Sequence, residues 1–466
     1  MNPPDSISLS KVLMAKLSYN QPLLPPFEAF HMEGPKSGLG SQLNNVYPED
    51  RAFHDWYRFV LSFPPHLVRH YLQDFGLGDT DTVLDPFCGT GTTLVESKLL
   101  GMRGIGLEPN PFPHFASSVK VDWDIDPDVL MKGVLEVADS AFASLRSQGI
   151  DDSSIFSEHD LELRTLSPNA ERILIKNSIS RVPLHKTLIL FDCLKAHAEE
   201  SYYKYGLLAL GSALVRSIGN LRFGPEVGVG KKKKDVPVVA AWLAEMRKMA
   251  SDLRQVAGRT YPRSVVHLAD ARELHSLLAP DSIDAVITSP PYPNEKDYTR
   301  TTRLESVVLG FIGDMAELRT LKKRLLRSNT RGVYKTDSDD QWVAGHAEIQ
   351  RIAAAIEGRR IELGKTSGFE RLYARVTTLY FGGMARHLAE VRPVLRPGAM
   401  LAYVVGDQAS YLQVMIRTGQ LLADIAERLG YRVERIDLFR TRFATATQSE
   451  LREEVVVLRW PGGQRQ

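Results

Sequence analysis

The stretch TVLDPFCGTGTT, residues 82–93, decides the fold class of this chain. Its apolar first half, TVLDPF (82–87), predicts a buried strand, and residues 92–100 predict a helix. Gly89 and Gly91 lie in the connection, where residues without a side chain let the backbone bend tightly and approach a ligand. The first turn of the helix presents unpaired N–H groups to that ligand. The pattern therefore predicts an α/β protein with a ligand site where this strand ends.

A second strand is predicted at RGIGLEPN, residues 103–110, with Glu108 near its end. A carboxylate at this place is positioned to accept hydrogen bonds from ribose hydroxyls. Two common cofactor motifs are disfavoured, because Leu94 replaces the third glycine of G-x-G-x-x-G and the G-K-[ST] of a phosphate-binding loop is absent. The expected ligand carries a ribose and turns a carboxylate or an amine toward the glycine loop.

Strand patterns resume later in the chain, separated by helical segments. The strands are SVVHLAD (264–270), DAVITSPPY (284–292), MLAYVVGD (400–407), YRVERIDLF (431–439) and EEVVVLRW (453–460), with an amphipathic helix at 419–429. We predict one Rossmann-like α/β sheet, interrupted by two mainly helical, basic insertions. The predicted divisions are an N-terminal arm (1–48), three parts of the sheet domain (49–122, 262–300 and 370–466) and the two insertions (123–261 and 301–369).

Composition limits the class of protein. The chain has 466 residues, of which 43% are hydrophobic and 24% are charged, close to the average of soluble globular proteins. No stretch approaches the roughly 18 uncharged apolar residues of a membrane span, and we find no secretory signal, so we expect a cytoplasmic protein. The only cysteines, Cys88 and Cys193, exclude a disulfide framework and a cysteine-based zinc site. We assign no metal ligand.

The net charge of +2 conceals two basic segments. Residues 205–263 hold 11 basic and 4 acidic side chains, and residues 317–335 hold 7 basic and 1 acidic. Such segments on an otherwise acidic chain favour a surface for a polyanion, since each neutralised phosphate releases counterions; solvated helix faces are the alternative. The predicted phosphate contacts are Lys231, Lys232, Lys233, Lys234, Lys322, Lys323 and Arg324, and the predicted base contacts are Arg222 and Arg331.

The tetrapeptide Ser289-Pro290-Pro291-Tyr292 ends a strand of buried type. The exocyclic amine of a nucleobase is a poor nucleophile because its lone pair is delocalised into the ring. Two acceptors, the Ser289 hydroxyl and the Pro290 carbonyl, could bind both amine hydrogens and favour a pyramidal nitrogen aimed at a methyl donor. The prolines restrict the backbone and remove competing N–H donors, and Tyr292 offers a ring for stacking on a base taken out of the helix.

Together, DPFCGTGTT, GIGLEPN and TSPPY resemble the S-adenosylmethionine-dependent amino-methyltransferases of DNA, which implies the Rossmann-like sheet of the class I methyltransferases. The resemblance implies that Phe87, Gly89 and Gly91 line the methionine end of S-adenosylmethionine, with Asp85 also among the cofactor-binding residues. It further implies that Glu108 holds the ribose, that Asp270 contacts the adenine amino group, and that LSFPPHLVRHYL (61–72) forms a helix that completes the methionine pocket.

The first residue of the tetrapeptide bears on the choice of base. In this family a serine, and TSPPY above all, is typical of cytosine-N4 enzymes, while aspartate or asparagine is more typical of adenine-N6 enzymes. Methylation at cytosine C5 needs a cysteine nucleophile, and Tyr292 occupies the position after the prolines. Cys88 is interpreted as a small buried residue of the glycine loop. The resemblance therefore implies methyl transfer to cytosine N4, with base flipping as the means of access.

The sequence thus predicts a cytosine-N4 methyltransferase of double-stranded DNA. An adenine-N6 enzyme, an RNA amino-methyltransferase and a nucleic-acid-binding protein without catalysis remain as alternatives. Two features depart from the family: the large insertion falls between the ribose-binding and adenine-binding strands, and the glycine loop precedes the tetrapeptide, unlike in many cytosine-N4 enzymes. The sequence leaves open the recognition site, the oligomeric state, and whether a cognate restriction or defence nuclease acts with it.

Overall fold

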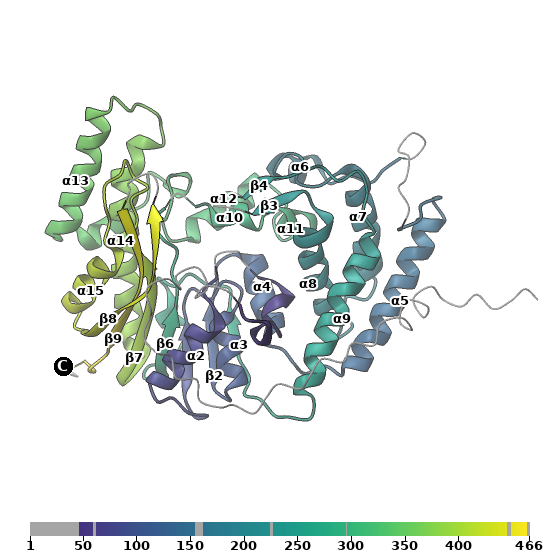
Figure 1. The fold of residues 1–466 in the computed structure, drawn as a ribbon, viewed down its shortest axis with the longest axis horizontal. Coiled ribbons are helices and arrows are strands. Elements are labelled where there is room, and N and C mark those ends of the chain that lie inside the picture. The colour runs from purple at the N-terminus through teal and green to yellow at the C-terminus, as the bar shows by residue number, and fades with distance from the viewer. Residues whose placement is uncertain are drawn as a thin grey trace, which may run out of the picture.

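The computed structural model describes residues 46–58, 62–153, 162–223, 227–294, 296–444 and 449–463. Nearly all of the predicted N-terminal arm lies outside these residues. A sheet with its covering helices forms one side of the molecule, and a layer of long helices forms the other (Figure 1). Shorter helices bridge the two sides.

The central sheet has seven strands in the order β5-β2-β1-β6-β7-β9-β8. They are β1 (Thr82–Asp85), β2 (Arg103–Leu107), β5 (Val265–His267), β6 (Ile283–Thr288), β7 (Leu395–Gly406), β8 (Arg432–Ala444) and β9 (Ser449–Arg459). The first five pair in parallel, and β9 runs antiparallel to both of its neighbours. This mostly parallel α/β sheet agrees with the predicted fold class and brings the carboxyl ends of five strands to one edge.

Apolar side chains cover both faces of the sheet, which explains the nearly continuous apolar runs of its central strands. Along β7, Leu401, Tyr403 and Val405 pack into one core with α14 (Tyr373–Val391) and α15 (Thr418–Arg428). Their neighbours Ala402 and Val404 pack on the opposite face with α2 (Pro65–Asp74). The strand is thus buried on both sides, and the helices α3 (Thr92–Leu99) and α4 (Pro111–Lys120) follow β1 and β2 along the chain.

Several strands end earlier than predicted because of proline. We predicted strands to residues 110 and 292, but β2 ends at Leu107 and β6 ends at Thr288. Pro109 and Pro290 follow almost at once, and a proline cannot donate to a sheet ladder. The chain therefore leaves the sheet just where Glu108 and the tetrapeptide begin.

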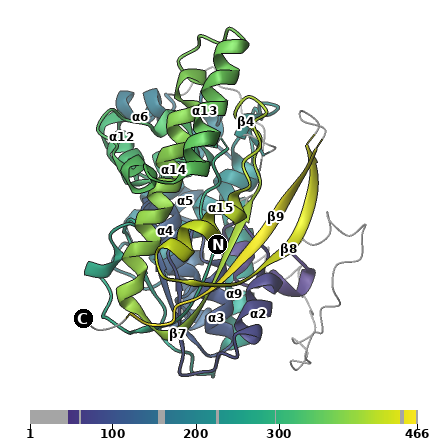
Figure 2. The same ribbon diagram turned by 90° about the vertical axis from the view of Figure 1, so that its left-hand side faces the viewer.

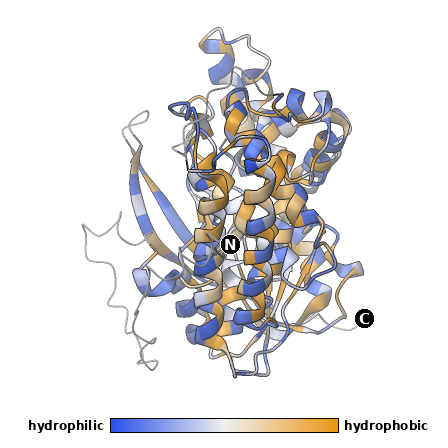
Figure 3. Cartoon of the chain, turned by 90° about the vertical axis from the view of Figure 1, so that its right-hand side faces the viewer, coloured by the Kyte–Doolittle hydropathy of each residue, from blue (hydrophilic) through white to orange (hydrophobic). Residues whose placement is uncertain are grey.

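The chain between β2 and β5 is mainly helical, as predicted. It contains α5 (Pro127–Arg146), α6 (Pro168–Ile173), α7 (Arg181–Lys195), α8 (Tyr203–Ala213), a π-helix (Leu214–Ile218), the hairpin β3 (Leu221–Phe223) to β4 (Val227–Val229), and α9 (Val238–Val256). The long helices turn hydrophobic stripes toward one another and polar faces outward (Figure 3).

The chain between β6 and β7 is also helical. It contains α10 (Tyr298–Thr301), α11 (Arg303–Val308), α12 (Met315–Arg324) and α13 (Ala347–Glu362). The division into domains and insertions stays a prediction.

Helix α14 lies at the start of the segment 370–466, before the strands predicted there. Its glycine pair allows an unusually close contact, since a Cβ at Gly382 would lie 1.9 Å from the carbonyl oxygen of Asp339. The close approach places the Asp339 carboxylate 2.5 Å from Arg272, which in turn binds Asp270. No helix of the described residues is long and apolar enough to cross a membrane.

We predict that Gly382→Ala lowers the free energy of unfolding by about 1–3 kcal/mol, the usual cost of forcing extra atoms into a packed contact. The control is Gly358→Ala in α13, where nothing lies within 4 Å of the added methyl group. That change should raise stability by up to about 1 kcal/mol through helix propensity. Urea unfolding, monitored by circular dichroism, measures the free energy of unfolding of both variants. Equal effects would show that the contact with Asp339 is not tight.

Candidate active site

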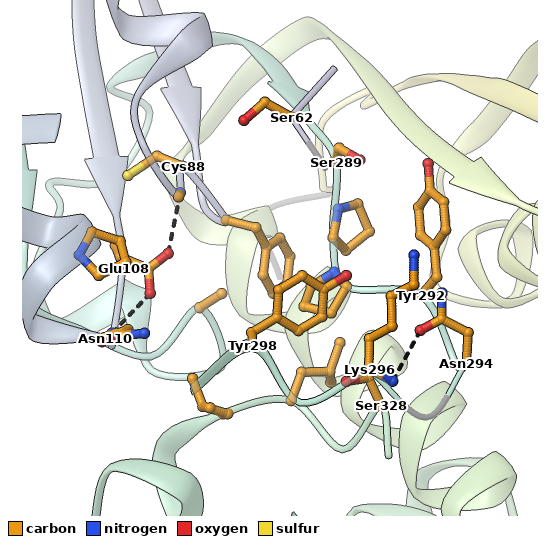
Figure 4. A pocket seen from close by; sticks show the side chains of 18 of the residues that line it. Ser62, Cys88, Glu108, Asn110, Ser289, Tyr292, Asn294, Lys296, Tyr298 and Ser328 are labelled. Atoms are coloured by element: carbon orange, nitrogen blue, oxygen red, sulfur yellow. Dashed lines mark hydrogen bonds between the residues drawn. The ribbon is translucent and has the colours of Figure 1, made fainter. Parts of the chain in front are cut away.

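A cavity of about 300 Å³ lies at the carboxyl ends of β1, β2 and β6 (Figure 4). This volume is at the lower end of the range for small-molecule sites. It is lined by many of the predicted site residues: Phe87, Gly89, Glu108, Asp270, Ser289, Pro290, Pro291, Tyr292, Lys322 and Arg324. Residues about 200 positions apart in the sequence therefore meet in one place. Asp85 and Gly91 are not among the described residues that line it.

The glycine loop owes its shape to two left-handed backbone positions. Gly89 has φ +50° and Gly91 has φ +82°, a region that glycine enters without strain. A Cβ at Gly91 would also lie 3.0 Å from Cβ of Ser117 in α4. Gly91 thus shapes the loop from behind, while Gly89 faces the cavity.

Lys120, which sequence analysis missed, holds the loop from inside the protein. Its side chain is buried, and Nζ donates to the carbonyl oxygens of Thr90 at 2.8 Å and Tyr57 at 3.3 Å. Burial lowers the pKa of this amine to about 7. A lone lysine at the end of a helix gives no sequence signal for such a role.

Asp85 connects the glycine loop to the strand that carries the tetrapeptide. Its Oδ1 accepts from the backbone N–H of Phe87 at 3.1 Å and from the Thr288 hydroxyl at 2.6 Å. Burial raises the pKa of this carboxyl group to about 6. We had placed Asp85 among the cofactor-binding residues, and the geometry describes it as a link beneath the cavity.

Glu108 projects into the cavity and is held by two backbone N–H groups (Figure 4). Oε2 accepts from Gly89 at 3.1 Å, and Oε1 accepts from Asn110 at 2.8 Å. Burial raises the pKa of Glu108 to about 7, and the two N–H groups oppose that shift. Each oxygen keeps a lone pair for a hydroxyl group of a ligand.

The acid predicted to contact adenine, Asp270, is clamped by Arg272. The guanidinium reaches the two Asp270 oxygens at 3.0 Å (Nε to Oδ1) and 2.6 Å (Nη2 to Oδ2). Arg272 in turn is paired with Asp339, so the position of Asp270 depends on α14 and the segment before it. Sequence analysis missed this arginine, because only the fold brings its second partner close.

His387 of α14 supports the same part of the cavity. The ring is fully buried between the Ala271 carbonyl oxygen, 2.9 Å from Nδ1, and the Tyr403 hydroxyl, 2.7 Å from Nε2. It also packs edge-on against Phe87, with ring centroids 4.8 Å apart. Burial lowers the pKa of His387 to about 4, so the ring is neutral at physiological pH.

The tetrapeptide forms the wall opposite Glu108 (Figure 4). The Ser289 hydroxyl donates to the carbonyl oxygen of Val404 at 3.2 Å, which leaves its lone pairs available as acceptors. The ring of Tyr292 lies against Gly406 of β7, where a Cβ would come within 3.0 Å of Cε2. Burial raises the pKa of Tyr292, so the phenol stays neutral.

Only some of the predicted contacts of the second basic segment line the cavity, and those have partners within the protein. Lys322 is ion-paired with Asp297 at 2.8 Å, and Nη2 of Arg324 donates to the Leu268 carbonyl oxygen at 2.7 Å. Lys323 and Arg331 do not line the cavity and lie over the rings of Tyr334 and Phe369. Their predicted contacts with nucleic acid remain predictions.

The predicted nucleic-acid contacts of the first basic segment lie in and after the β3–β4 hairpin. Arg222, Lys231, Lys232 and Lys234 are exposed. Lys233 differs, because its Nζ donates to the carbonyl oxygens of Ser217 at 2.6 Å and Gly219 at 2.7 Å. The hairpin also accepts a hydrogen bond from Arg300, which follows the tetrapeptide, so this basic segment lies on the same side of the molecule as the cavity.

Comparisons with known proteins match this chain to DNA methyltransferases. A family model for N6/N4-type DNA methylases matches residues 37–114, which include α2, the glycine loop and Glu108. The Type II methyltransferase M.BsoBI of Geobacillus stearothermophilus is 25% identical over 427 residues, covering 86% of this chain and 82% of its own. M.AvaI of a Nostoc strain, also named a Type II methyltransferase, is 24% identical over 440 residues, covering 87% and 84%. A tRNA (guanine(10)-N2)-dimethyltransferase of Methanothermobacter thermautotrophicus is 37% identical over only 65 residues, covering 14% and 18%.

The fold and the cavity define an α/β protein in which the glycine loop, Glu108 and the Ser-Pro-Pro-Tyr tetrapeptide line one cavity at the carboxyl edge of the sheet. The comparisons support a DNA methyltransferase of the N4/N6 type, a family whose methyl donor is S-adenosylmethionine. These matches do not distinguish between the two amines.

We predict that Glu108→Ala weakens the binding of S-adenosylmethionine by about 1.5–3 kcal/mol, the scale of a hydrogen bond to a charged group. The affinity of the wild type should also rise between pH 6 and pH 8, because the carboxyl group loses its proton near pH 7 and becomes a stronger acceptor. Glu108→Gln should lose this part of the pH dependence. Calorimetry at several pH values measures both effects.

The control is Glu136→Gln, at an exposed position of α5. It should bind as the wild type does at every pH, and it corrects for the titration of the cofactor itself. Unchanged affinity in a folded Glu108→Ala variant would remove Glu108 from the site.

Proposed function

We propose that this protein transfers a methyl group from S-adenosylmethionine to the exocyclic N4 amine of cytosine in double-stranded DNA, after the base has left the helix. One observation carries the proposal: the glycine loop with Glu108 and the Ser-Pro-Pro-Tyr tetrapeptide line the same cavity. A donor bound by the first group would therefore face an amine bound by the second.

The cavity suits the cofactor chemically. Glu108 offers carboxylate oxygens for the ribose hydroxyls, and Asp270 offers an acceptor for the adenine amino group. The buried hydroxyl of Thr90 has no hydrogen-bond partner in the described structure and belongs to the loop expected to bind the methionine end. When bound, S-adenosylmethionine supplies an electrophilic methyl group on its sulfonium.

The protein's own contribution is to make the amine nucleophilic and to aim it. The Ser289 hydroxyl donates its hydrogen bond to the Val404 carbonyl oxygen, so its lone pairs are left to accept from an amine N–H on its other side. The Pro290 carbonyl provides the second acceptor, and the tertiary amides of Pro290 and Pro291 offer no N–H to compete. Tyr292, held against Gly406, supplies a ring for stacking on the base.

The alternatives differ in their support. The serine at position 289 favours cytosine N4 over adenine N6, by the family correlation alone. An RNA substrate is less well supported, because the long matches are to proteins named Type II methyltransferases and the tRNA enzyme matches only a short segment. A binding protein without catalysis does not explain why the serine hydroxyl and the glycine loop share a cavity.

Mass spectrometry of digested DNA from cells that express the chain tests the base choice directly, and sequencing of the modified positions yields the recognition site. We expect N4-methylcytosine. Ser289→Ala should lower the rate of methyl transfer more than it weakens DNA binding, whereas Tyr292→Ala should also reduce base flipping, reported by 2-aminopurine at the target.

Removal of a base-stacking ring costs roughly 1–3 kcal/mol, which sets the size of the effect expected for Tyr292→Ala. N6-methyladenine as the product would overturn the base choice and keep the mechanism. 5-Methylcytosine, or full activity in both variants, would overturn the mechanism.

DNA is proposed to lie over the cavity and across the exposed lysines after the β3–β4 hairpin. Replacing Lys231 and Lys232 by alanine should weaken binding to all sequences and flatten its salt dependence by about 0.9 for each phosphate that is no longer neutralised. The control replaces Lys132 and Arg146, which are exposed on α5 at the far side of the helical layer. Fluorescence anisotropy at several salt concentrations measures the slopes. The same slope in both variants would mean that the lysines are only solvated.

A further inference from the structure

The wall of the cavity formed by β8 and β9 contains a charged pair that the proposed chemistry does not use. Arg440 of β8 lies opposite Glu453 of β9 in the sheet register, and Nε donates to Oε2 at 2.6 Å. Both residues line the cavity. Glu453 is also opposite Gly406 in the pairing of β9 with β7. Figure 2 shows β8 and β9 as a long ribbon at the edge of the sheet.

The pair lies next to the ring proposed to hold the base. A Cβ at Gly406 would be 3.0 Å from Cε2 of Tyr292 and 3.3 Å from Cγ of Glu453, so the tyrosine ring and the glutamate side chain meet over this glycine. The side chain of Arg440 lies beside that of Glu453 and is mostly buried, with 19% of it exposed. The sheet ladder and the ion pair together restrict where its guanidinium can point.

Several other cations that line the cavity have partners within the protein. Lys322 is bound to Asp297, Arg324 to the Leu268 carbonyl, and Arg327 to Asp337. Arg440 uses only Nε in its ion pair, and in the described part of the chain neither of its terminal nitrogens has a hydrogen-bond partner. Four N–H donors of a guanidinium fork are therefore available at the wall beside Tyr292.

The two candidate bases differ in what they would present to such a fork. When Ser289 and Pro290 hold the amine, cytosine still offers two adjacent acceptors, N3 and O2. Adenine offers N1 and then a C–H group, so one donor would lose its hydration without a partner. Sites built to form a hydrogen bond reject a substrate that cannot form it.

We propose that Arg440, positioned by Glu453, binds the N3 and O2 edge of the flipped cytosine and selects it against adenine. This inference rests on the proposed function and adds the residue that reads the base. Glu453 has a second effect, because its negative charge beside the guanidinium limits how much electron density the fork draws from the amine.

A double-mutant cycle that combines a change in the base with a change at Arg440 tests the contact. The recognition duplex is prepared with 3-deaza-2′-deoxycytidine at the target, which replaces N3 by a C–H group. For the wild type, kcat/KM should fall roughly 5- to 150-fold, the range for one bidentate contact to a base. Arg440→Met should reduce kcat/KM by a similar factor on the normal duplex and show little further reduction on the analogue. The matched control Arg442→Met removes the same charge from the same wall and should keep the full sensitivity to N3.

Cofactor affinity measured by calorimetry shows whether each variant retains a folded site. Arg440→Lys keeps one donor, so it should restore part of the rate on cytosine.

If the effects of the analogue and of Arg440→Met are independent, the inference is wrong while the proposed function stands. If the wild type produces N6-methyladenine, the proposed base choice fails first, and this inference fails with it.

Discussion

The parallel pairing of β1 with β6 is the contact on which the site depends. Val83 pairs with Ala285 and Leu84 with Val286, so two segments about 200 residues apart end side by side at one edge of the sheet. The glycine loop leaves the end of β1, and the tetrapeptide leaves the end of β6. Because the carboxyl ends of parallel strands share an edge, a cofactor and a nucleobase bound there would be neighbours.

Hydrogen bonds below the cavity maintain this alignment. The Thr288 hydroxyl of β6 donates to Asp85 of β1, and the Thr93 hydroxyl of α3 donates to the Ile287 carbonyl oxygen of β6 at 3.0 Å, so β6 is bound both to β1 and to the helix that follows β1. Lys120 holds the loop from behind. These groups are buried, and breaking one would leave a polar atom without a partner, at a cost of about 1–3 kcal/mol. The geometry of the proposed site is therefore stabilised by groups that do not line the cavity.

Charge is distributed differently from what the composition of the basic segments suggests. Several cations are used inside the protein: Lys233 binds two carbonyl groups, and Lys322 pairs with Asp297. Others, including Lys231 and Lys232, remain exposed near the hairpin. A run of identical residues can thus contain both structural and surface positions, because the backbone turns each side chain toward a different environment.

The sequence by itself determined the class of fold and the local motifs of the proposed site. Gly89, Glu108 and the Ser-Pro-Pro-Tyr tetrapeptide were identified because strand ends, glycines and prolines leave short-range signals that do not depend on distant contacts. The α/β class followed from the same signals, and the mostly parallel sheet agrees with it. Only the tertiary structure decided which residues support that chemistry. Arg272, His387 and Arg440 carry no motif, and their positions depend on partners in other elements of the fold: Asp339, Tyr403 and Glu453. Asp85, which was predicted to bind the cofactor, is not among the described residues that line the cavity and is bound to Thr288 of β6. The physical reason is that burial and long-range pairing are set by the packing of strands and helices, which a local pattern of residues does not contain.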